Sequence, residues 1–148
     1  MNKRHFIALV FAAVITGVYG TPAQSEPPVS DLMPSDIKWK DSPIPGVQTA
    51  VIYGDPAASG VYIIRAKLAA GAKVPPHTHP DTRYDTVLGG ELYFGFGEMF
   101  EANNAKLYPA GAQITVPANT PHFAWVKNGE AILQEVGIGP SAYIPVKK

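Results

Sequence analysis

The sequence contains no cysteine, and this absence limits both its stability and its chemistry. No disulfide can form, so export to an oxidising compartment would add no covalent crosslink to the fold. Thiolates, which are common zinc ligands, are excluded as well. Any metal ion must therefore be held by imidazole nitrogens and oxygen atoms.

A long hydrophobic run is also lacking. Residues 6–18 form the main apolar stretch, and they are too few to cross a bilayer comfortably as a permanent anchor. Lys3 and Arg4 precede this stretch, and small residues follow it, which is typical of a secretory signal peptide. We expect residues 1–25 to be this signal peptide and the mature chain to be secreted or periplasmic.

The position of the cut follows from the small residues after the apolar stretch. Ala23, Gln24 and Ser25 have the small-x-small form that precedes a cleavage site. Cuts after residue 20 or 23 fit similar triplets and remain alternatives. An uncleaved N-terminal anchor is a further alternative.

The chain has no excess of either charge, with 12 Lys and Arg against 12 Asp and Glu. Removing Lys3 and Arg4 with the leader leaves ten basic and twelve acidic residues, so the mature chain is near −2. Such a surface has no electrostatic attraction for nucleic acid or an anionic membrane. We therefore expect a small-molecule ligand or substrate as partner, with no nucleic acid and no membrane after signal cleavage; a homodimer is left open.

Length and composition favour one all-β domain. The chain has 148 residues with 14 Gly and 15 Pro, which suits short strands and many turns. In residues 61–68, alternate side chains are apolar, as in a half-buried antiparallel strand. Residues 84–88 and 91–96 are expected to pair as a hairpin, and residues 97–105 to form a long loop or hairpin tip. Further strands are expected at 37–39, 47–53, 106–108, 113–116, 122–126 and 131–136, a spacing typical of a sandwich or barrel.

The histidines are the most informative residues of the chain. There are four, and His5 lies in the expected leader, so the mature chain has only His77, His79 and His122. Prolines precede His77 and favour extended backbone, in which residues i and i+2 leave the same face about 6–7 Å apart. Both imidazoles can then converge on one metal ion.

The residues around these histidines resemble two motifs of a known family. The first reads Gly71-x5-His77-x-His79, with Gly90 farther along the chain. The second reads Gly111-x5-Pro117-x-Asn119-x2-His122. They look like the two motifs of the cupin superfamily, and the resemblance covers about residues 60–136. The chain is similar to small single-domain cupins and to the cupin domains of some anti-sigma factors.

The resemblance implies an all-β fold of the cupin type, a jelly-roll β-barrel also called a double-stranded β-helix. The expected organisation is a signal peptide (1–25), an extended lead-in (26–45), a cupin domain (46–140) and a C-terminal tail (141–148). The family commonly holds one metal ion inside the barrel. Carried over, the ligands are His77, His79 and His122, and the cofactor is one divalent ion, with Fe, Zn, Mn, Ni and Cu all open.

The sequence departs from the family pattern where a glutamate ligand usually completes the first motif. Depending on the alignment, Arg83 or Tyr84 occupies that position. Arginine stays protonated and has no lone pair to donate, so Arg83 cannot be a ligand. To act as a ligand, Tyr84 would have to lose the proton of its hydroxyl group, whose unperturbed pKa is near 10. Asp81 and Asp85 are conceivable substitutes.

Three residues are candidates for a catalytic role. They are Arg83, Tyr84 and Gln113, the last at the start of an expected strand from which its amide can reach the pocket. An inward Arg83 would favour a ligand that carries a carboxylate, enolate or phenolate, whereas an outward Arg83 is only a surface charge.

Several aromatic residues on strands near the histidines are candidates to line the pocket, although core packing is the simpler expectation for each. They are Tyr93, Phe94, Phe96, Phe123 and Trp125. Strand parity separates the face of His122 from the face that carries Phe123 and Trp125. One of these two faces must therefore pack outside the barrel. In the second motif, Asn119 replaces the usual glycine, and asparagine tolerates left-handed turn geometry better than most residues.

Two classes of function follow. The first is a small exported metalloenzyme, similar to Fe(II)-dependent dioxygenases with three-histidine sites, acting on a small organic substrate that can be anionic. The second is a non-catalytic module that binds or senses a metal or small ligand. A barrel that has lost its metal is a third, simpler reading. Metal binding is expected to weaken below about pH 6, because each imidazole must be neutral to bind.

Overall fold

The computed structural model describes residues 30–147, and from Asp31 onward these residues belong to one unit built almost entirely of strands. The expected signal peptide, residues 1–25, lies outside the described residues. No helix in the described part of the chain is long and apolar enough to cross a membrane. Two short 3-10 turns are the only helical elements among these residues: η1 (Pro34–Asp36) and η2 (Ala102–Asn104).

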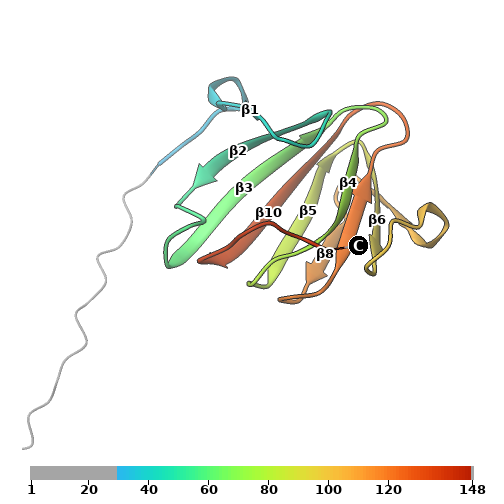
Figure 1. Ribbon diagram of the computed structural model, residues 1–148. Coiled ribbons are helices and arrows are strands. Elements are labelled where there is room, and N and C mark those ends of the chain that lie inside the picture. The colour runs from blue at the N-terminus through green and yellow to red at the C-terminus, as the bar shows by residue number, and fades with distance from the viewer. Residues whose placement is uncertain (1–29, 148) are drawn as a thin grey trace, which may run out of the picture. The chain divides into compact units, whose positions relative to one another are not determined.

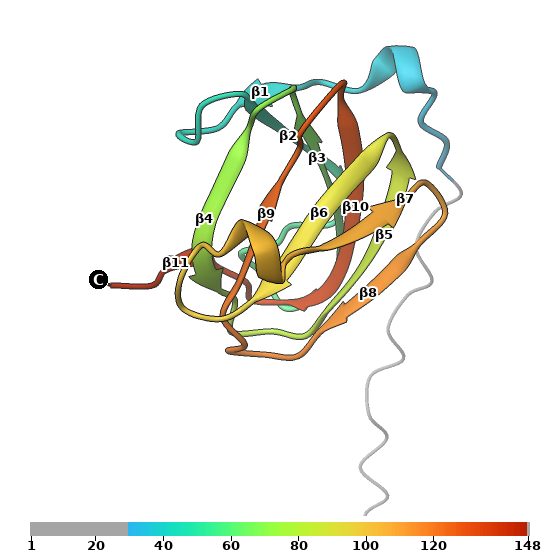
Figure 2. The same ribbon diagram turned by 90° about the vertical axis from the view of Figure 1, so that its right-hand side faces the viewer.

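The strands form two antiparallel sheets that face each other, as Figures 1 and 2 show. The first sheet has six strands in the order β1 (Lys40–Asp41), β2 (Val47–Tyr53), β3 (Gly60–Leu68), β10 (Ala131–Gly139), β5 (Arg83–Gly89) and β8 (Gln113–Val116). The second has five strands in the order β11 (Ile144–Pro145), β4 (Lys73–Thr78), β9 (His122–Trp125), β6 (Glu91–Phe96) and β7 (Lys106–Pro109). The chain passes repeatedly between the sheets, which makes the fold a jelly-roll barrel.

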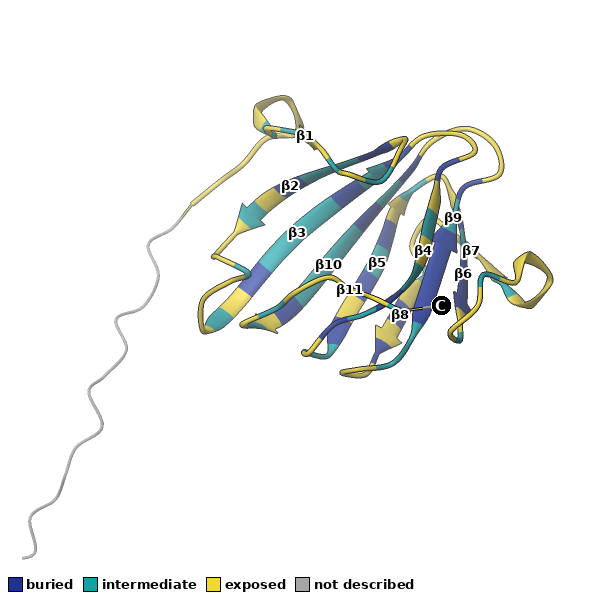
Figure 3. Ribbon diagram, viewed as in Figure 1, coloured by how far each residue is buried: buried dark blue, intermediate teal, exposed yellow. Residues whose placement is uncertain are grey.

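Most expected strands are confirmed, because their alternation of apolar and polar residues matches the two faces of a sheet. In β3, Tyr62, Ala66 and Leu68 are buried, and the neighbours between them are less so. The expected strand at 37–39 is displaced to β1. Figure 3 shows that buried residues lie mainly along the strands and exposed residues mainly in the connecting loops.

The expected hairpin between residues 84–88 and 91–96 is wrong. These segments are β5 and β6, and they belong to different sheets. Gly89 and Gly90 carry the chain from one sheet to the other, with Gly90 at a positive φ of 72°. A side chain there would collide with the carbonyl of Glu130. The alternation along the two strands gives their inward faces but not their partners, so the sequence could not separate a hairpin from a crossing.

The core between the sheets is aliphatic apart from Phe94. Its buried members are Val47, Ala66, Leu68, Ala72, Val87, Leu92, Phe94, Ile114, Val116, Ala124, Val126, Ala131 and Leu133. On the opposite face of β9, Phe123 packs outside the barrel against Phe100, with ring centroids 4.9 Å apart. The 97–105 segment therefore covers the second face of β9, as strand parity required.

The C-terminal residues cross the end of the barrel next to the histidines. We call residues 140–146 the C-terminal strap. Within it, β11 pairs with β4, placing Ile144 opposite Thr78 and Pro145 opposite His77. Residues 141–148, expected as a tail, thus include a strand that adds to the second sheet.

Candidate metal centre

The three histidines come together inside the barrel. His77 lies on β4 opposite His122 on β9, and His79 directly follows β4. One ring nitrogen from each lies within 4.8 Å of the other two. All three residues are buried, with 6%, 5% and 3% of their surface exposed for His77, His79 and His122. A single atom between them can therefore contact all three rings.

Each imidazole is held by a backbone carbonyl. Nδ1 of His77 donates to Pro75 O at 2.9 Å, Nδ1 of His79 to Ala142 O at 2.7 Å, and Nδ1 of His122 to Thr120 O at 2.9 Å. A carbonyl can only accept, so the proton must be on Nδ1 in each neutral ring. The lone pair is consequently on Nε2, the nitrogen that remains free to bind a metal.

The electrostatics of the site keep the rings neutral. Burial is the main cause that lowers the pKa of His77 to about 3, with a contribution from the nearby His122. Burial likewise lowers the pKa of His79 to about 4 and also lowers that of His122. Neutral imidazoles with oriented Nε2 lone pairs are the form that binds a metal. The three residues therefore fit one metal ion, and no other His, Asp or Glu of the described residues completes this ligand group.

Arg83 points into the barrel, but its charge is already balanced. Its guanidinium forms a buried ion pair with Glu135 and donates to Ser141 Oγ at 2.9 Å. The sequence left open whether Arg83 lies inward and attracts an anionic ligand. The structure places it inward and supplies the anion from β10, so an external anion is not needed to neutralise it.

A hydrogen-bonded network extends from Arg83 to the wall of the barrel. Ser141 Oγ also donates to Asp81, and Asp81 accepts from the hydroxyl of Tyr62. Burial and this bond to Asp81 raise the pKa of Tyr62 to about 12. Gly137 makes room for the contact, because any side chain there would collide with Tyr62 and Asp81. Asp81 thus has a structural partner and lies outside the three-histidine group.

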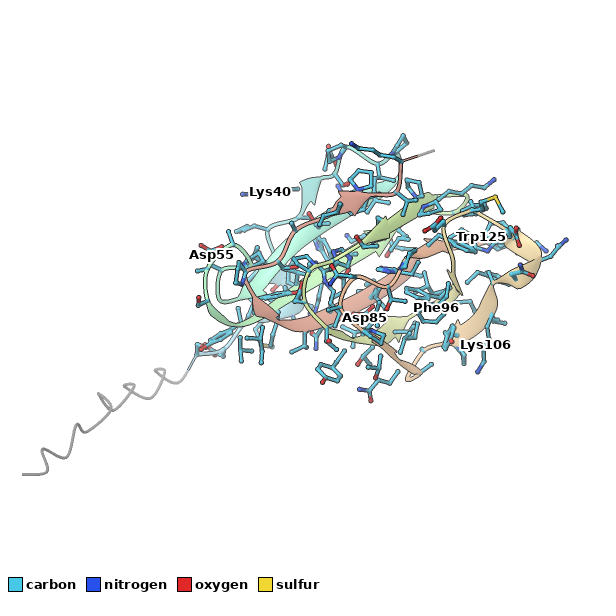
Figure 4. All side chains as sticks on the ribbon, turned by 60° about the horizontal axis from the view of Figure 1, so that its bottom comes forward. Lys40, Asp55, Asp85, Phe96, Lys106 and Trp125 are labelled. Atoms are coloured by element: carbon cyan, nitrogen blue, oxygen red, sulfur yellow. The ribbon has the colours of Figure 1, made fainter. Side chains whose placement is uncertain are left out.

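Asp85 lies on β5 on the same face as Arg83. It lines the cavity that contains the histidines, and Figure 4 labels it nearer the middle of the view than Lys40 and Lys106. It is 2% exposed, and its Oδ1 has no partner among the described residues. Burial raises the pKa of Asp85 well above its ordinary value, and the neighbouring Glu135 acts in the same direction. Asp85 therefore tends to keep its proton.

Two other candidates face away from the histidines. Tyr84 is 48% exposed because it follows Arg83 on β5 and so points to the opposite side of the sheet. Gln113 is exposed at the start of β8. Neither side chain lines the cavity that contains the histidines. Asn119 has a φ of 59°, the left-handed geometry expected for the second motif. Its backbone N–H donates to the backbone carbonyl of His79 at 2.7 Å.

The histidines form part of the wall of a cavity of about 510 Å³. Most of the remaining wall is apolar, with Ile64, Leu68, Val74, Phe94 and Leu133 among its residues. Of the aromatic residues proposed from the sequence, only Phe94 belongs to this wall, and its ring stacks on His122 with centroids 5.2 Å apart. The polar part consists of the histidines, Arg83, Asp85 and Glu135, with Ser42, Thr49 and Tyr143.

Sequence reasoning missed Glu135 and Tyr143. Glu135 has the same strand parity as the buried Ala131 and Leu133, and a lone carboxylate on an apolar face was a readable signal. Tyr143 stacks on His77 with ring centroids 4.3 Å apart. Its segment has no periodic pattern, so nothing in the local sequence indicated that contact.

Comparison with known proteins finds similar structures but no similar sequence. No protein-family model matches the chain, and no curated sequence is significantly similar. The polyketide cyclase RemF from Streptomyces resistomycificus is similar in structure, with a TM-score of 0.69, 16% identity, and coverage of 81% of this chain and 87% of RemF. An RmlC-like cupin from Shewanella frigidimarina matches with a TM-score of 0.58, 16% identity, and coverage of 79% and 91%. The chain has the cupin fold.

A third similar structure is an oxalate oxidase, with a TM-score of 0.58, 22% identity, and coverage of 74% of this chain and 60% of the oxidase. The structures similar in fold thus include two enzymes, a polyketide cyclase and an oxalate oxidase. This cupin barrel carries its three-histidine group on β4, the residue after β4, and β9, where the two motifs of the sequence had placed it.

Proposed function

We propose that the protein is an exported metalloenzyme that binds one divalent metal ion through His77, His79 and His122 and acts on a small organic molecule. The convergence of three oriented Nε2 lone pairs on an otherwise apolar cavity carries this proposal. The similarity in fold to a polyketide cyclase and an oxalate oxidase supports an enzymatic role.

The reaction we favour is oxygen-dependent cleavage of the dioxygenase type. His77, His79 and His122 would hold an Fe(II) ion, which would supply the oxygen chemistry when bound. The protein contributes the orientation of the imidazoles through three carbonyls and an apolar wall that excludes water. The balanced charge of Arg83 favours a substrate that enters uncharged.

The test is metal analysis followed by an oxygen-uptake screen. Purified protein should contain about one metal ion per chain, and the Fe(II) form should consume oxygen with one member of a panel of β-diketones and thiols. His77→Ala and His122→Ala should lose the metal and the activity, whereas the exposed-residue control Gln113→Ala should keep both. Full metal content in either histidine variant would contradict the ligand assignment.

A second candidate is a binding or sensing module, and one contact favours it. Tyr143 of the C-terminal strap stacks on His77, so a change at the metal centre reaches a segment on the molecular surface. A sensor would bind its ligand at one equivalent without turnover. Calorimetry combined with product analysis separates the two functions.

A further inference from the structure

Glu135 is a carboxylate placed in a wall made mostly of apolar residues. It lies on β10 opposite Asp85 of β5, and it lines the same cavity as the three histidines. Its side chain is 14% exposed, so it is largely but not completely covered. A carboxylate at such a position loses hydration and needs a compensating partner.

The two oxygens of Glu135 have different surroundings. Oε2 accepts from Arg83, which fixes the carboxylate in the ion pair. Oε1 accepts no hydrogen bond from the described residues, and it is not among their fully buried unpaired atoms, which are Arg83 Nε, Asp85 Oδ1 and Trp125 Nε1. Oε1 is therefore accessible and keeps a lone pair to accept a proton.

Glu135 is close to the histidines without being part of their ligand group. The three ring nitrogens form a set within 4.8 Å that does not include a Glu135 oxygen. Burial dominates the lowered pKa of His79 and of His122, and the charge of Glu135 acts on both in the opposite direction. Glu135 and the three histidines line one cavity of about 510 Å³, which has room for a small bound molecule in contact with both.

Asp85 is the other carboxyl group beside Arg83. It is more deeply buried than Glu135, and burial favours its protonated form. One guanidinium near two carboxyl groups can neutralise only one negative charge. Of the two, Glu135 forms the ion pair with Arg83 and therefore carries the negative charge. It is the one that can act as a base.

We propose that Glu135 is the proton acceptor for a weakly acidic, uncharged substrate bound at the three-histidine site, an inference that rests on the proposed function. The substrate's O–H or acidic C–H bond breaks, and its electron pair stays on the substrate as an enolate or phenolate. A lone pair of Glu135 Oε1 forms the new O–H bond. Charge and atoms balance without an oxidant, and the substrate becomes an anion only inside the cavity.

The experiment counts protons when a β-diketone binds. Acetylacetone is titrated calorimetrically into Zn²⁺-loaded protein in buffers of different ionisation enthalpy, which gives the number of protons released to solvent. Zn²⁺ has no redox chemistry, so oxygen cannot interfere. Wild type should release about zero protons, because Glu135 takes up the proton, and Glu135→Gln should release about one. Glu130→Gln, the same change at an exposed residue, should behave like wild type.

A second variant serves as the control for a loss of folding stability. Glu135→Gln leaves Arg83 without its partner, so Arg83→Met/Glu135→Gln removes both charges and should also release about one proton. Equal proton release from wild type and both variants, each containing Zn²⁺, would overturn the role of Glu135 alone. Absence of Zn²⁺ binding, or of acetylacetone binding to Zn²⁺-loaded wild type, would instead overturn the metal centre on which the inference rests.

Discussion

The imidazoles of the candidate metal centre differ from exposed histidines in their pKa, which changes the expected pH dependence of metal binding. If each imidazole had its ordinary pKa near 6.5, protonation of each one would lower the metal affinity about thirtyfold at pH 5. Burial lowers the pKa of His77 to about 3 and that of His79 to about 4. Protons therefore compete for these nitrogens at a lower pH than the value near 6 expected from sequence.

We predict that Zn²⁺ affinity changes less than about threefold between pH 7 and pH 5 and falls steeply only near pH 4. Competition titration with a chelator of known pH dependence measures this. A decrease of a thousandfold or more by pH 5 would show that the rings are exposed to solvent in the metal-free protein.

Arg83 and Glu135 form a pair in which each residue depends on the other. With side chains 7% and 14% exposed, removing one partner leaves a buried charge without compensation. We predict that Arg83→Met lowers the free energy of unfolding by about 3–5 kcal/mol, measured by urea denaturation. Arg83→Met/Glu135→Leu should recover most of that loss. Equal stability of wild type and Arg83→Met would mean that water already screens the pair.

At the scale of secondary-structure elements, the C-terminal strap is part of the candidate metal centre. The hydroxyl of Ser141 accepts a hydrogen bond from Arg83 and donates one to Asp81. The carbonyl of Ala142 accepts from His79, and the ring of Tyr143 stacks on His77. Three successive residues therefore orient two ligands and the ion pair. The strap is held to the barrel by the pairing of β11 with β4.

We predict that truncation after Gly139 lowers metal affinity by about 10–100-fold, because His79 loses the carbonyl that fixes its tautomer. Truncation after Val146 keeps all of these contacts and serves as the matched control. Circular dichroism checks that both proteins fold, and chelator competition gives the affinity. Equal affinity in the two truncated proteins would mean that the strap only covers the site.

At the scale of the whole molecule, the export that we propose depends on residues outside the described part of the chain. We predict that protein recovered from the periplasm begins after residue 20, 23 or 25, because Lys3, Arg4 and a short apolar run precede those positions. Intact mass spectrometry decides between the three cuts. Recovery of a chain that still carries Lys3 would support an uncleaved anchor.

The barrel also brings together two groups of residues from distant parts of the chain. The histidines come from β4, the residue that follows it, and β9, while Arg83 and Glu135 come from neighbouring strands of the other sheet. The three-histidine group and the proposed proton acceptor thus come from opposite sheets and line the same cavity. A small molecule between the sheets can contact both.

The sequence by itself determined the all-β class, most strand positions and the three histidines, because these follow from local alternation, turn residues and the scarcity of histidine. It also indicated the left-handed turn at Asn119. Only the tertiary structure decided which strands pair, that Arg83 is neutralised by Glu135, and that the strap contacts His77 and His79. The physical reason is that alternation fixes the face of a strand without naming its neighbour, so an inward charge cannot be matched to its partner until the sheets are assembled.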